Sequence, residues 1–213
     1  LSRRQAGANW EKANVLGKSQ NENKKQKKDK KFTKYVAMDC EMVGIGPTGR
    51  DDMVARVSIV NQHGEVLLDK YVKPTEEVTD YRTKVSGIRP HNIENGEQFE
   101  NVQNEVINLL KDKILVGHSV STDLAVLAIK HPSKLIRDTA KYRPLAKTVS
   151  NGSTPSLKKL SKVILGVDIQ NGEHNSVEDA RATMAVYNRI SGDWEKNIKK
   201  AIIRANRAGR GRT

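Results

Sequence analysis

The segment AMDCEMV at residues 37–43 places two acidic residues, Asp39 and Glu41, inside an apolar run. Side chains alternate along a strand, so both carboxylates share one face with Ala37 and Val43. Two ionised carboxylates this close repel each other unless a cation lies between them. A solvent-exposed strand face is the plain alternative, but two further apolar strands follow and favour a central position. A hard divalent cation, Mg²⁺ or Mn²⁺, is the simplest partner because these ions prefer carboxylate oxygens.

The pattern of apolar residues predicts an α/β domain with a mixed sheet. Strands joined by short connections, which favour an antiparallel meander, are predicted over residues 35–43, 53–61 and 65–72. Helical and strand patterns then alternate, with helices over 97–112, 121–130, 154–166 and 176–190 and strands over 113–118 and 134–139. Thr154 is the predicted cap of the third helix and Gly166 its end.

The segment GIGPTG at residues 44–49 spells G-x-G-x-x-G after the first strand, a pattern typical of dinucleotide-binding folds. That function requires the motif to open a helix, whose N-terminus holds the pyrophosphate. Residues 53–61 read as a strand instead, and Arg50 and Asp51 stand where a phosphate loop requires Lys and Ser or Thr. The sequence therefore predicts a hairpin turn here and no nucleotide cofactor.

The positive charge of the chain is concentrated at its two ends. The formal net charge of the 213 residues is +13, but residues 35–195 carry 20 basic and 22 acidic groups. Residues 1–34 and 193–213 lack the apolar content needed to pack, so they are predicted to be disordered basic arms around a body at 35–192. Such arms favour attraction of a polyanion or nuclear targeting, and a solubilising tail is the plain alternative.

Cysteine content and hydropathy exclude several classes of protein. Cys40 is the only cysteine, which rules out an intrachain disulfide and a cysteine-based zinc site and fits a reducing, intracellular compartment. No segment is long and apolar enough to span a membrane, and none resembles a secretory signal. We expect no membrane partner, and we expect the protein to be a monomer. The chain opens at Leu1, so its true start is expected to lie upstream.

Two further acidic residues are candidates to meet the first pair. Asp123 follows VGHSVST in the first turn of a helix, and Asp179 lies in SVED at the start of the last helix. Each also suits an ordinary role, because acids favour helix N-termini and Ser176 with Asp179 would form a capping box. Asp138, at the end of KLIRDT, is ranked lower, as polar support of a strand exit.

One histidine lies close in sequence to a candidate metal ligand. His174 precedes Asp179 by five residues, in the loop GEHNS. If Asp179 binds a metal ion, His174 lies beside the same site, and an ordinary pKa of about 6.5 suits it to accept a proton from water. A lone loop histidine is otherwise simply exposed. His118 and His91 have no such neighbour and are expected to be structural.

The ordered set of DCE at 39–41, GHSVSTD ending at Asp123, and HNSVED with His174 and Asp179 resembles the DEDD 3′→5′ exonucleases of the histidine subtype. AMDCEMVG, RVSIVN and HNSVEDARATM are most similar to the RNA exonuclease 4 branch, a group of nuclear and nucleolar enzymes of eukaryotes. The resemblance covers residues 35–192 and none of the acids is missing. It implies a ribonuclease H-like fold whose five-stranded mixed sheet has the DCE strand at its centre, flanked by strands that donate or precede the later motifs.

The resemblance also implies a role for each site residue. Asp39 would bridge two divalent metal ions, Mg²⁺ or Mn²⁺, that clamp an in-line phosphoryl displacement. Glu41 and Asp179 would hold the ion that carries the attacking water, and Asp123 would hold the other ion. His174 would deprotonate the water.

By the same resemblance, the main chain at Met42 and Val43 binds the 3′-terminal nucleotide. Nucleoside 5′-monophosphates would leave one at a time from single-stranded 3′ ends, with RNA preferred to DNA. The chain has only two Phe, two Trp and five Tyr, so extensive base stacking is not expected and gripping of the nucleic-acid backbone is favoured. The expected role is RNA processing or ribosome biogenesis. The expected location is the nucleus, and within it the nucleolus.

Two other functions stay open: a metal-dependent endonuclease, and a non-catalytic RNA-binding assembly factor on the same fold. The full set of acids argues against the assembly factor, because an inactive site has no reason to keep clustered charge. The spacing from His174 to Asp179 favours an exonuclease over an endonuclease. A substrate with a blocked 3′ end distinguishes the two, since an endonuclease still cuts it.

Overall fold

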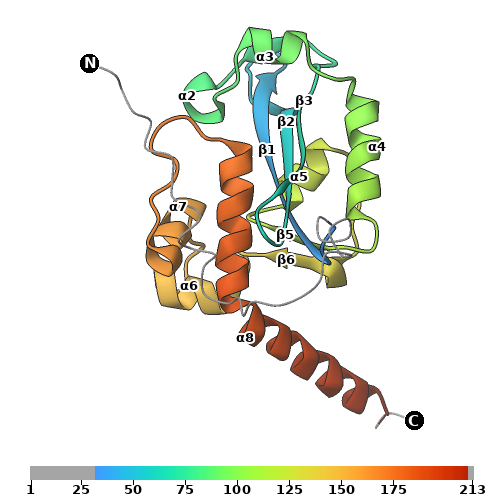
Figure 1. Ribbon diagram of the computed structural model, residues 1–213, viewed down its shortest axis with the longest axis vertical. Coiled ribbons are helices and arrows are strands. Elements are labelled where there is room, and N and C mark those ends of the chain that lie inside the picture. The colour runs from blue at the N-terminus through green and yellow to red at the C-terminus, as the bar shows by residue number, and fades with distance from the viewer. Residues whose placement is uncertain (1–31, 211–213) are drawn as a thin grey trace, which may run out of the picture.

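The computed structural model describes residues 32–210, which form a twisted mixed sheet with helices on both faces (Figure 1). The strands are β1 Tyr35–Ile45, β2 Asp51–Asn61, β3 Val66–Tyr71, β4 Val78–Asp80, β5 Ile114–Gly117 and β6 Ile136–Asp138. Their order is β3-β2-β1-β5-β6, and β4 pairs with the end of β1. β1, β2 and β3 are antiparallel neighbours, whereas β5 and β6 run parallel to β1. The predicted meander and the central position of the DCE strand are confirmed, and β4 is an addition to the five expected strands.

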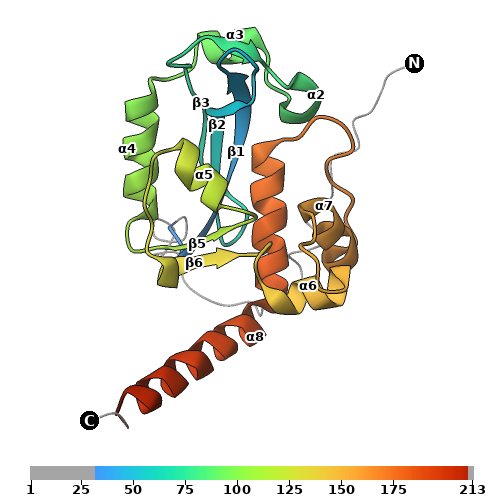
Figure 2. The ribbon, with the colours of Figure 1, turned by 180° about the vertical axis from the view of Figure 1, so that it is seen from behind.

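The helices cover the two faces of the sheet unequally. They are α2 Thr83–Ser86, α3 Pro90–Glu94, α4 Phe99–Leu110, α5 Ser121–Val126, η1 Ser133–Leu135, α6 Arg143–Ser150, α7 Leu157–Leu160, η2 Ser161–Leu165 and α8 Ser176–Arg210. α4 and α5 lie on one face and α8 on the other, with α6 and α7 packed beside α8 (Figures 1 and 2). Among these helices of residues 32–210, none combines the length and the apolar content needed to cross a bilayer.

Alternation along β1 divides its side chains between two apolar cores. Met38 and Cys40 pack with α4 and α5, while Ala37 packs against α8. Asp39 and Glu41 follow Ala37 at intervals of two and so point toward the side on which α8 begins. The period-two pattern read from the sequence therefore determines which helix can meet the two carboxylates.

The glycine motif forms the hairpin turn between β1 and β2, as predicted. Gly46 and Gly49 have φ values of 72° and 64°, and Gly49 N donates a hydrogen bond to Gly46 O at 3.2 Å. A side chain at Gly44 would collide with the carbonyl oxygen of Gly49. Because β2 rather than a helix follows at Asp51, the motif is not a dinucleotide site.

The third predicted helix starts later than expected. Ser156, and not Thr154, caps α7, since its side chain accepts a hydrogen bond from Lys159 N at 3.2 Å. A start at Leu157 puts the first helical side chain into the core, where it is 5% exposed. Gly166 ends the following turn of π-helix in the left-handed region, with φ 69°, as predicted.

The last helix, α8, is longer than predicted and runs to Arg210. Trp194 lies past the predicted domain boundary but is only 6% exposed, within the core. The boundary at residue 192 therefore falls inside a helix, and residues 193–210 are helical where a disordered arm was expected. Ala, Lys and Arg, all good helix formers, dominate this stretch. The N-terminal arm up to residue 31 and the last three residues lie outside the described part of the chain.

Candidate metal centre

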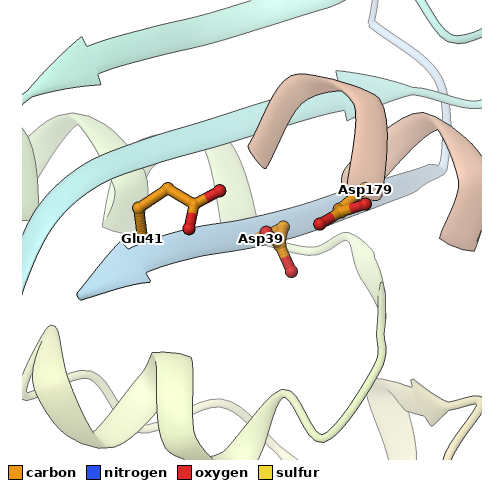
Figure 3. Close-up of side chains that lie close together, drawn as sticks. All are labelled: Asp39, Glu41 and Asp179. Carbon is orange, nitrogen blue, oxygen red and sulfur yellow. The ribbon is translucent and has the colours of Figure 1, made fainter. Parts of the chain in front are cut away.

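Three of the four predicted acids meet where β1 passes the start of α8, as Figure 3 shows. One carboxylate oxygen each from Asp39, Glu41 and Asp179 lies within 4.8 Å of the others. We call these three residues the acid cluster. Glu41 and Asp179 are 5% and 3% exposed, so their charges are largely removed from water. The donors are hard oxygens of the kind that Mg²⁺ and Mn²⁺ prefer.

Burial raises the pKa of every member of the acid cluster, and repulsion from other members adds to this for Asp39 and Glu41. The pKa of Asp39 is well above its usual value, through burial first and then through the charges of Asp123, Asp179 and Glu41. Burial, with repulsion from Asp179, raises the pKa of Glu41 to about 8. Burial likewise raises the pKa of Asp179 to about 6. Carboxyl groups that resist ionisation near neutral pH form an unfavourable arrangement, which a bound cation relieves.

Two buried carboxylate oxygens of the acid cluster have no hydrogen-bond partner within residues 32–210, namely Glu41 Oε1 and Asp179 Oδ1. The other oxygen of Asp179, Oδ2, accepts a hydrogen bond from Gln170 Nε2 at 2.9 Å. Buried polar atoms are nearly always paired, so unpaired ones call for an explanation. These oxygens remain available as ligands, and both the donor chemistry and the unpaired atoms fit a divalent metal ion.

Asp123 lies beside the acid cluster, at the edge of β1 where its pairing with β5 ends. The parallel pairing stops at Ala37 and Val116, and Cys40 N donates a hydrogen bond to Asp123 Oδ1 at 2.9 Å. Burial raises the pKa of Asp123 to about 6, and its charge raises the pKa of Asp39. The expected position in the first turn of a helix is confirmed. Asp123 is therefore electrostatically coupled to the cluster while a main-chain bond fixes its carboxylate.

A buried pair of hydroxyl groups fixes the start of α8 against β2. Ser58 Oγ and Ser176 Oγ are 2.7 Å apart, and both residues are fully buried. Ser176 does not take the capping role considered as an alternative, because it is already the first residue of α8. Asn175 takes that role, since its Oδ1 accepts a hydrogen bond from Val177 N at 3.1 Å. The contact holds the first turn of the helix, which carries Asp179, over the strands.

His174 approaches the acid cluster from the loop before α8. Its Nδ1 lies 3.9 Å from Asp179 Oδ2, and its side chain is 33% exposed. Burial, followed by the positive charge of Lys158, lowers the pKa of His174. The neutral imidazole, which is the form able to accept a proton, is therefore favoured near neutral pH.

The loop that carries His174, residues 170–175, is held by the segment around α2 and α3. His174 N donates a hydrogen bond to Val85 O at 2.6 Å. The Arg89 guanidinium donates two hydrogen bonds to the Glu173 carboxylate, at 3.0 and 2.6 Å. We call residues 170–175 the histidine loop. Its position depends on contacts with residues 80 or more positions earlier in the sequence, which the sequence pattern did not indicate.

Met42 and Val43 lie just past an irregularity in the β1–β2 pairing. The register shifts between Glu41 and Met42, which marks a bulge in β1. Val43 is fully buried and Met42 is half-buried. Bulges often occur beside active sites, where they redirect the chain. The binding of a 3′-terminal nucleotide by this main chain stays a prediction.

Asp138 and His118, two of the residues expected to be structural, make structural contacts, whereas His91 is exposed on α3. Asp138 Oδ1 accepts hydrogen bonds from Ser119 N at 2.8 Å and Ala140 N at 3.0 Å, so it supports the exit of β6 as predicted. His118 Nδ1 lies 2.9 Å from Thr139 Oγ1. These contacts hold the turn that leads into α5, and with it Asp123.

The sequence profile of the exonuclease family RNase_T matches residues 36–187. The chain belongs to this exonuclease family. It is 55% identical over 166 residues to the Mus musculus protein named RNA exonuclease 4, a stretch that covers 78% of this chain and 38% of that protein. The protein of the same name from Candida glabrata is 53% identical over 175 residues, which cover 82% of this chain and 66% of that protein. The chain thus spans less than two thirds of the length of these relatives.

Two solved Pan2 structures share this fold. The Saccharomyces cerevisiae Pan2 pseudoubiquitin hydrolase–RNA exonuclease module in complex with A7 RNA has a TM-score of 0.66 and 29% identity, over 84% of this chain and 32% of that chain. The Neurospora crassa Pan2 catalytic unit has a TM-score of 0.67 at 22% identity, over 85% of this chain and 31% of that chain. The predicted exonuclease family and the predicted ribonuclease H-like fold are therefore confirmed.

Proposed function

We propose that the chain is a metal-dependent 3′→5′ exoribonuclease that releases nucleoside 5′-monophosphates from single-stranded 3′ ends. The observation that carries this proposal is the convergence of the acid cluster, with Asp123 beside it, in a chain of the exonuclease family. The name of the curated relatives and the RNA bound to the Pan2 module support RNA as the substrate. Water attacks the last phosphodiester, and the products are a 5′-monophosphate and a new 3′-hydroxyl end.

The acids of the site would hold two divalent cations, Mg²⁺ or Mn²⁺. Asp39 lies between Glu41 and Asp179 (Figure 3), and the charges of these two residues and of Asp123 all raise its pKa, which suits a ligand shared by both ions. Asp123, which lies at the edge of β1, would help to hold the second ion. When bound, these cations supply Lewis-acid stabilisation of the charge that develops on the phosphoryl oxygens.

His174 would accept the proton of the attacking water. Its lowered pKa keeps the imidazole neutral and ready for that task. Once protonated, the ring would lie near the carboxylate of Asp179, whose Oδ2 is 3.9 Å from Nδ1. The imidazolium would thus form beside a negative charge that stabilises it.

The 3′-terminal nucleotide would bind along the main chain at Met42 and Val43. The bulge before Met42 interrupts regular pairing with β2 at this point, which supports a site where main-chain groups face a ligand. The low aromatic content of the chain supports recognition of the backbone over stacking of bases.

The proposed cellular role is RNA processing, including rRNA processing for ribosome biogenesis, in the nucleus and its nucleolus. The family resemblance and the basic charge of both ends of the chain support this setting. A monomeric state and the absence of a membrane partner remain predictions.

The proposal is tested with a 5′-labelled single-stranded RNA incubated with Mg²⁺ or Mn²⁺. A ladder of products shortened one nucleotide at a time, absent in EDTA, is expected. A matched RNA with a blocked 3′ end should stay intact. Cleavage of the blocked RNA at internal positions would establish the endonuclease, and binding of RNA without cleavage under any metal condition would establish the assembly factor.

A further inference from the structure

Beyond Trp194, α8 leaves the domain and projects away from the sheet, as both views show (Figures 1 and 2). We call residues 196–207 the basic arm. All of its residues are exposed except Ile198, which is half-buried. It contains five Lys or Arg residues and no acidic residue. The arm also lies outside residues 36–187, the part that matches the exonuclease family.

The direction of the basic arm is set by a buried anchor at its start. The Arg137 guanidinium donates two hydrogen bonds to the Glu195 carboxylate, at 2.6 and 3.0 Å, and Tyr187 Oη donates a third at 2.9 Å. The Trp194 ring stacks on Tyr142, with centroids 3.9 Å apart and planes 7° from parallel. The Arg137 side chain is only 5% exposed, and breaking a buried ion pair is costly, so the pair between Arg137 and Glu195 resists disruption. The helix is thus held firmly where it leaves the domain.

The basic residues of the arm gather on one side of the helix. Lys196, Lys200, Arg204 and Arg207 follow one another at intervals of four, four and three, which places them on a single face. Like charges at these intervals destabilise a helix. At the start of this face, Lys196 Nζ lies 3.9 Å from the carboxylate of Asp193, and Glu195 is already paired with Arg137. A polyanion lying along this face would relieve the repulsion, as the phosphate backbone of a nucleic acid does.

A groove runs from α5, the helix that carries Asp123, to the anchor of the arm. It has a volume of about 390 Å³, and its lining includes Ser121, Lys141 and Trp194. Ser121 precedes Asp123 by two residues, and Lys141 Nζ donates a hydrogen bond to Ser121 Oγ at 3.2 Å. Asp138 also lines the groove, and its carboxylate lies 3.7 Å from Lys141 Nζ. The groove therefore offers a path from the site toward the arm with a lysine on its wall.

We propose that the basic arm binds the phosphate backbone of the RNA substrate, upstream of the 3′ end that enters the metal centre. This inference rests on the proposed function, because it takes RNA as the substrate. At a rise of about 1.5 Å per residue, Lys196 lies about 26 Å and Arg207 about 42 Å along α8 from Asp179. At the duplex spacing of about 3.4 Å per phosphate, a strand needs roughly 8–12 nucleotides to cover these distances, and an extended single strand needs fewer. A trinucleotide is too short to touch the arm, whereas a 30-nucleotide RNA reaches all of it.

The test measures how the affinity for a 30-nucleotide single-stranded RNA depends on salt, in EDTA so that nothing is cut. The full chain is compared with a variant carrying K196Q, K200Q, R204Q and R207Q, because glutamine keeps helix propensity while removing charge. Each phosphate contact on a single strand contributes about 0.7 to the salt slope, so loss of four contacts lowers the slope by up to ~2.8. When salt is raised from 50 to 200 mM, this difference in slope means that the variant loses roughly 50-fold less affinity than the wild type.

Two control variants make the outcome specific. Four lysines near the ends of α4, changed as K73Q, K111Q, K113Q and K130Q, remove the same charge elsewhere and should leave the wild-type slope. K196R with K200R keeps the charge of the arm and should also keep the slope. A basic-arm variant with the wild-type slope, or an equal loss in the α4 control, overturns the proposal. A basic arm that captures a protein partner while RNA affinity stays unchanged overturns it as well.

A cleavage assay separates this inference from the proposed function. With Mn²⁺ present, the basic-arm variant should shorten the 30-nucleotide RNA more slowly than the wild type below saturation, and cleave a trinucleotide at the wild-type rate. If the wild type cleaves both RNAs and the variant matches it on both, the arm proposal fails and the proposed function stands. If the wild type cleaves neither, the proposed function fails, and the salt slope in EDTA still reports on the arm.

Discussion

The acid cluster and the histidine loop contribute to one site but are held in different ways. The three acids sit on the central strand and on the first turn of α8, which the buried contact between Ser58 and Ser176 holds in place. The histidine loop is tied to the segment around α2 and α3 by one main-chain bond and by an ion pair whose two side chains, Arg89 and Glu173, are 45% and 43% exposed. A rigid frame can keep repelling charges together, whereas a loop with exposed contacts is free to adjust. We therefore expect the effects of substitutions in the two regions to differ, both in the size of the loss of activity and in whether metal binding is lost.

Removal of Asp39 should have the largest effect, because this carboxylate is central to the acid cluster. We expect Asp39→Ala to lower the rate of hydrolysis of a 3′-labelled RNA by more than about 10⁴-fold, beyond the contribution of a single general base. Asp39→Asn keeps the shape and removes the charge, so it should be nearly as inactive. Near-normal hydrolysis by either variant would contradict the assignment of the site.

His174→Ala should lower the rate by about 10²–10⁴-fold, the usual contribution of a positioned general base. Unlike Asp39→Ala, it should leave metal binding intact, because the ring is not a member of the acid cluster. Mn²⁺ affinity and single-turnover rates measured on the same preparation distinguish the two variants. Equal loss of metal binding in both would show that the histidine acts as a ligand and not as a base.

Glu41→Gln should make the metal-free protein more stable, because burial raises the pKa of this carboxyl to about 8. A raised folded-state pKa gives stability that is present below about pH 4.5, the ordinary value, and is lost as pH rises through about 8. In EDTA, the free energy of unfolding of the wild type should therefore decrease as the pH is raised from about 4.5 to about 8. The variant should exceed it at pH 8 by an amount on the order of 1–3 kcal/mol.

Thermal melts of both proteins at pH 5, 6.5 and 8 measure this difference. Addition of Mn²⁺ should raise the melting temperature of the wild type more than that of Glu41→Gln, since a ligand that binds only the folded state stabilises it. The same dependence on pH in both proteins would mean that Glu41 is not under electrostatic strain.

Disruption of the pair between Arg89 and Glu173 should have the smallest effect. Exposed ion pairs contribute little because solvent screens them, so Arg89→Ala should lower the turnover rate of a short RNA by no more than about tenfold. The pH profile should keep the same shape, because the imidazole itself is unchanged. Exchange of the charges, as Arg89→Glu with Glu173→Arg, should restore most of the rate. If the double exchange is no better than either single change, the pair does not position the histidine loop.

Local periodicity explains why much of the fold could be predicted from the sequence. The alternation of AMDCEMV placed Asp39 and Glu41 on one face, and that face meets α8 as the structure shows. Helical spacing located α4, α5 and α8, and the order of elements indicated a mixed sheet. Asp123, His174 and Asp179 were candidates from their positions in the sequence, and the family resemblance joined them with Asp39 and Glu41 into one ordered set.

The features that were not predicted depend on contacts between distant segments or on short elements. β4, α2, α3 and α6 were missed, since stretches of three to eight residues give little periodicity to read. Nothing local indicates that Arg89 meets a glutamate 84 residues later. The helical arm was missed because, within residues 196–207, Ile198 is the one residue that packs against a core cluster, so the arm shows no core-facing stripe long enough to detect.

The central claim is that the acid cluster binds divalent cations, and calorimetric titration of the metal-free protein with Mn²⁺ tests it most directly. The account predicts saturable uptake of Mn²⁺ that tightens from pH 6 to pH 8, because the carboxyl groups must lose their protons before they bind the ion. The uptake should be lost in Asp39→Asn. No uptake by the wild type, or equal uptake by Asp39→Asn, would contradict the account.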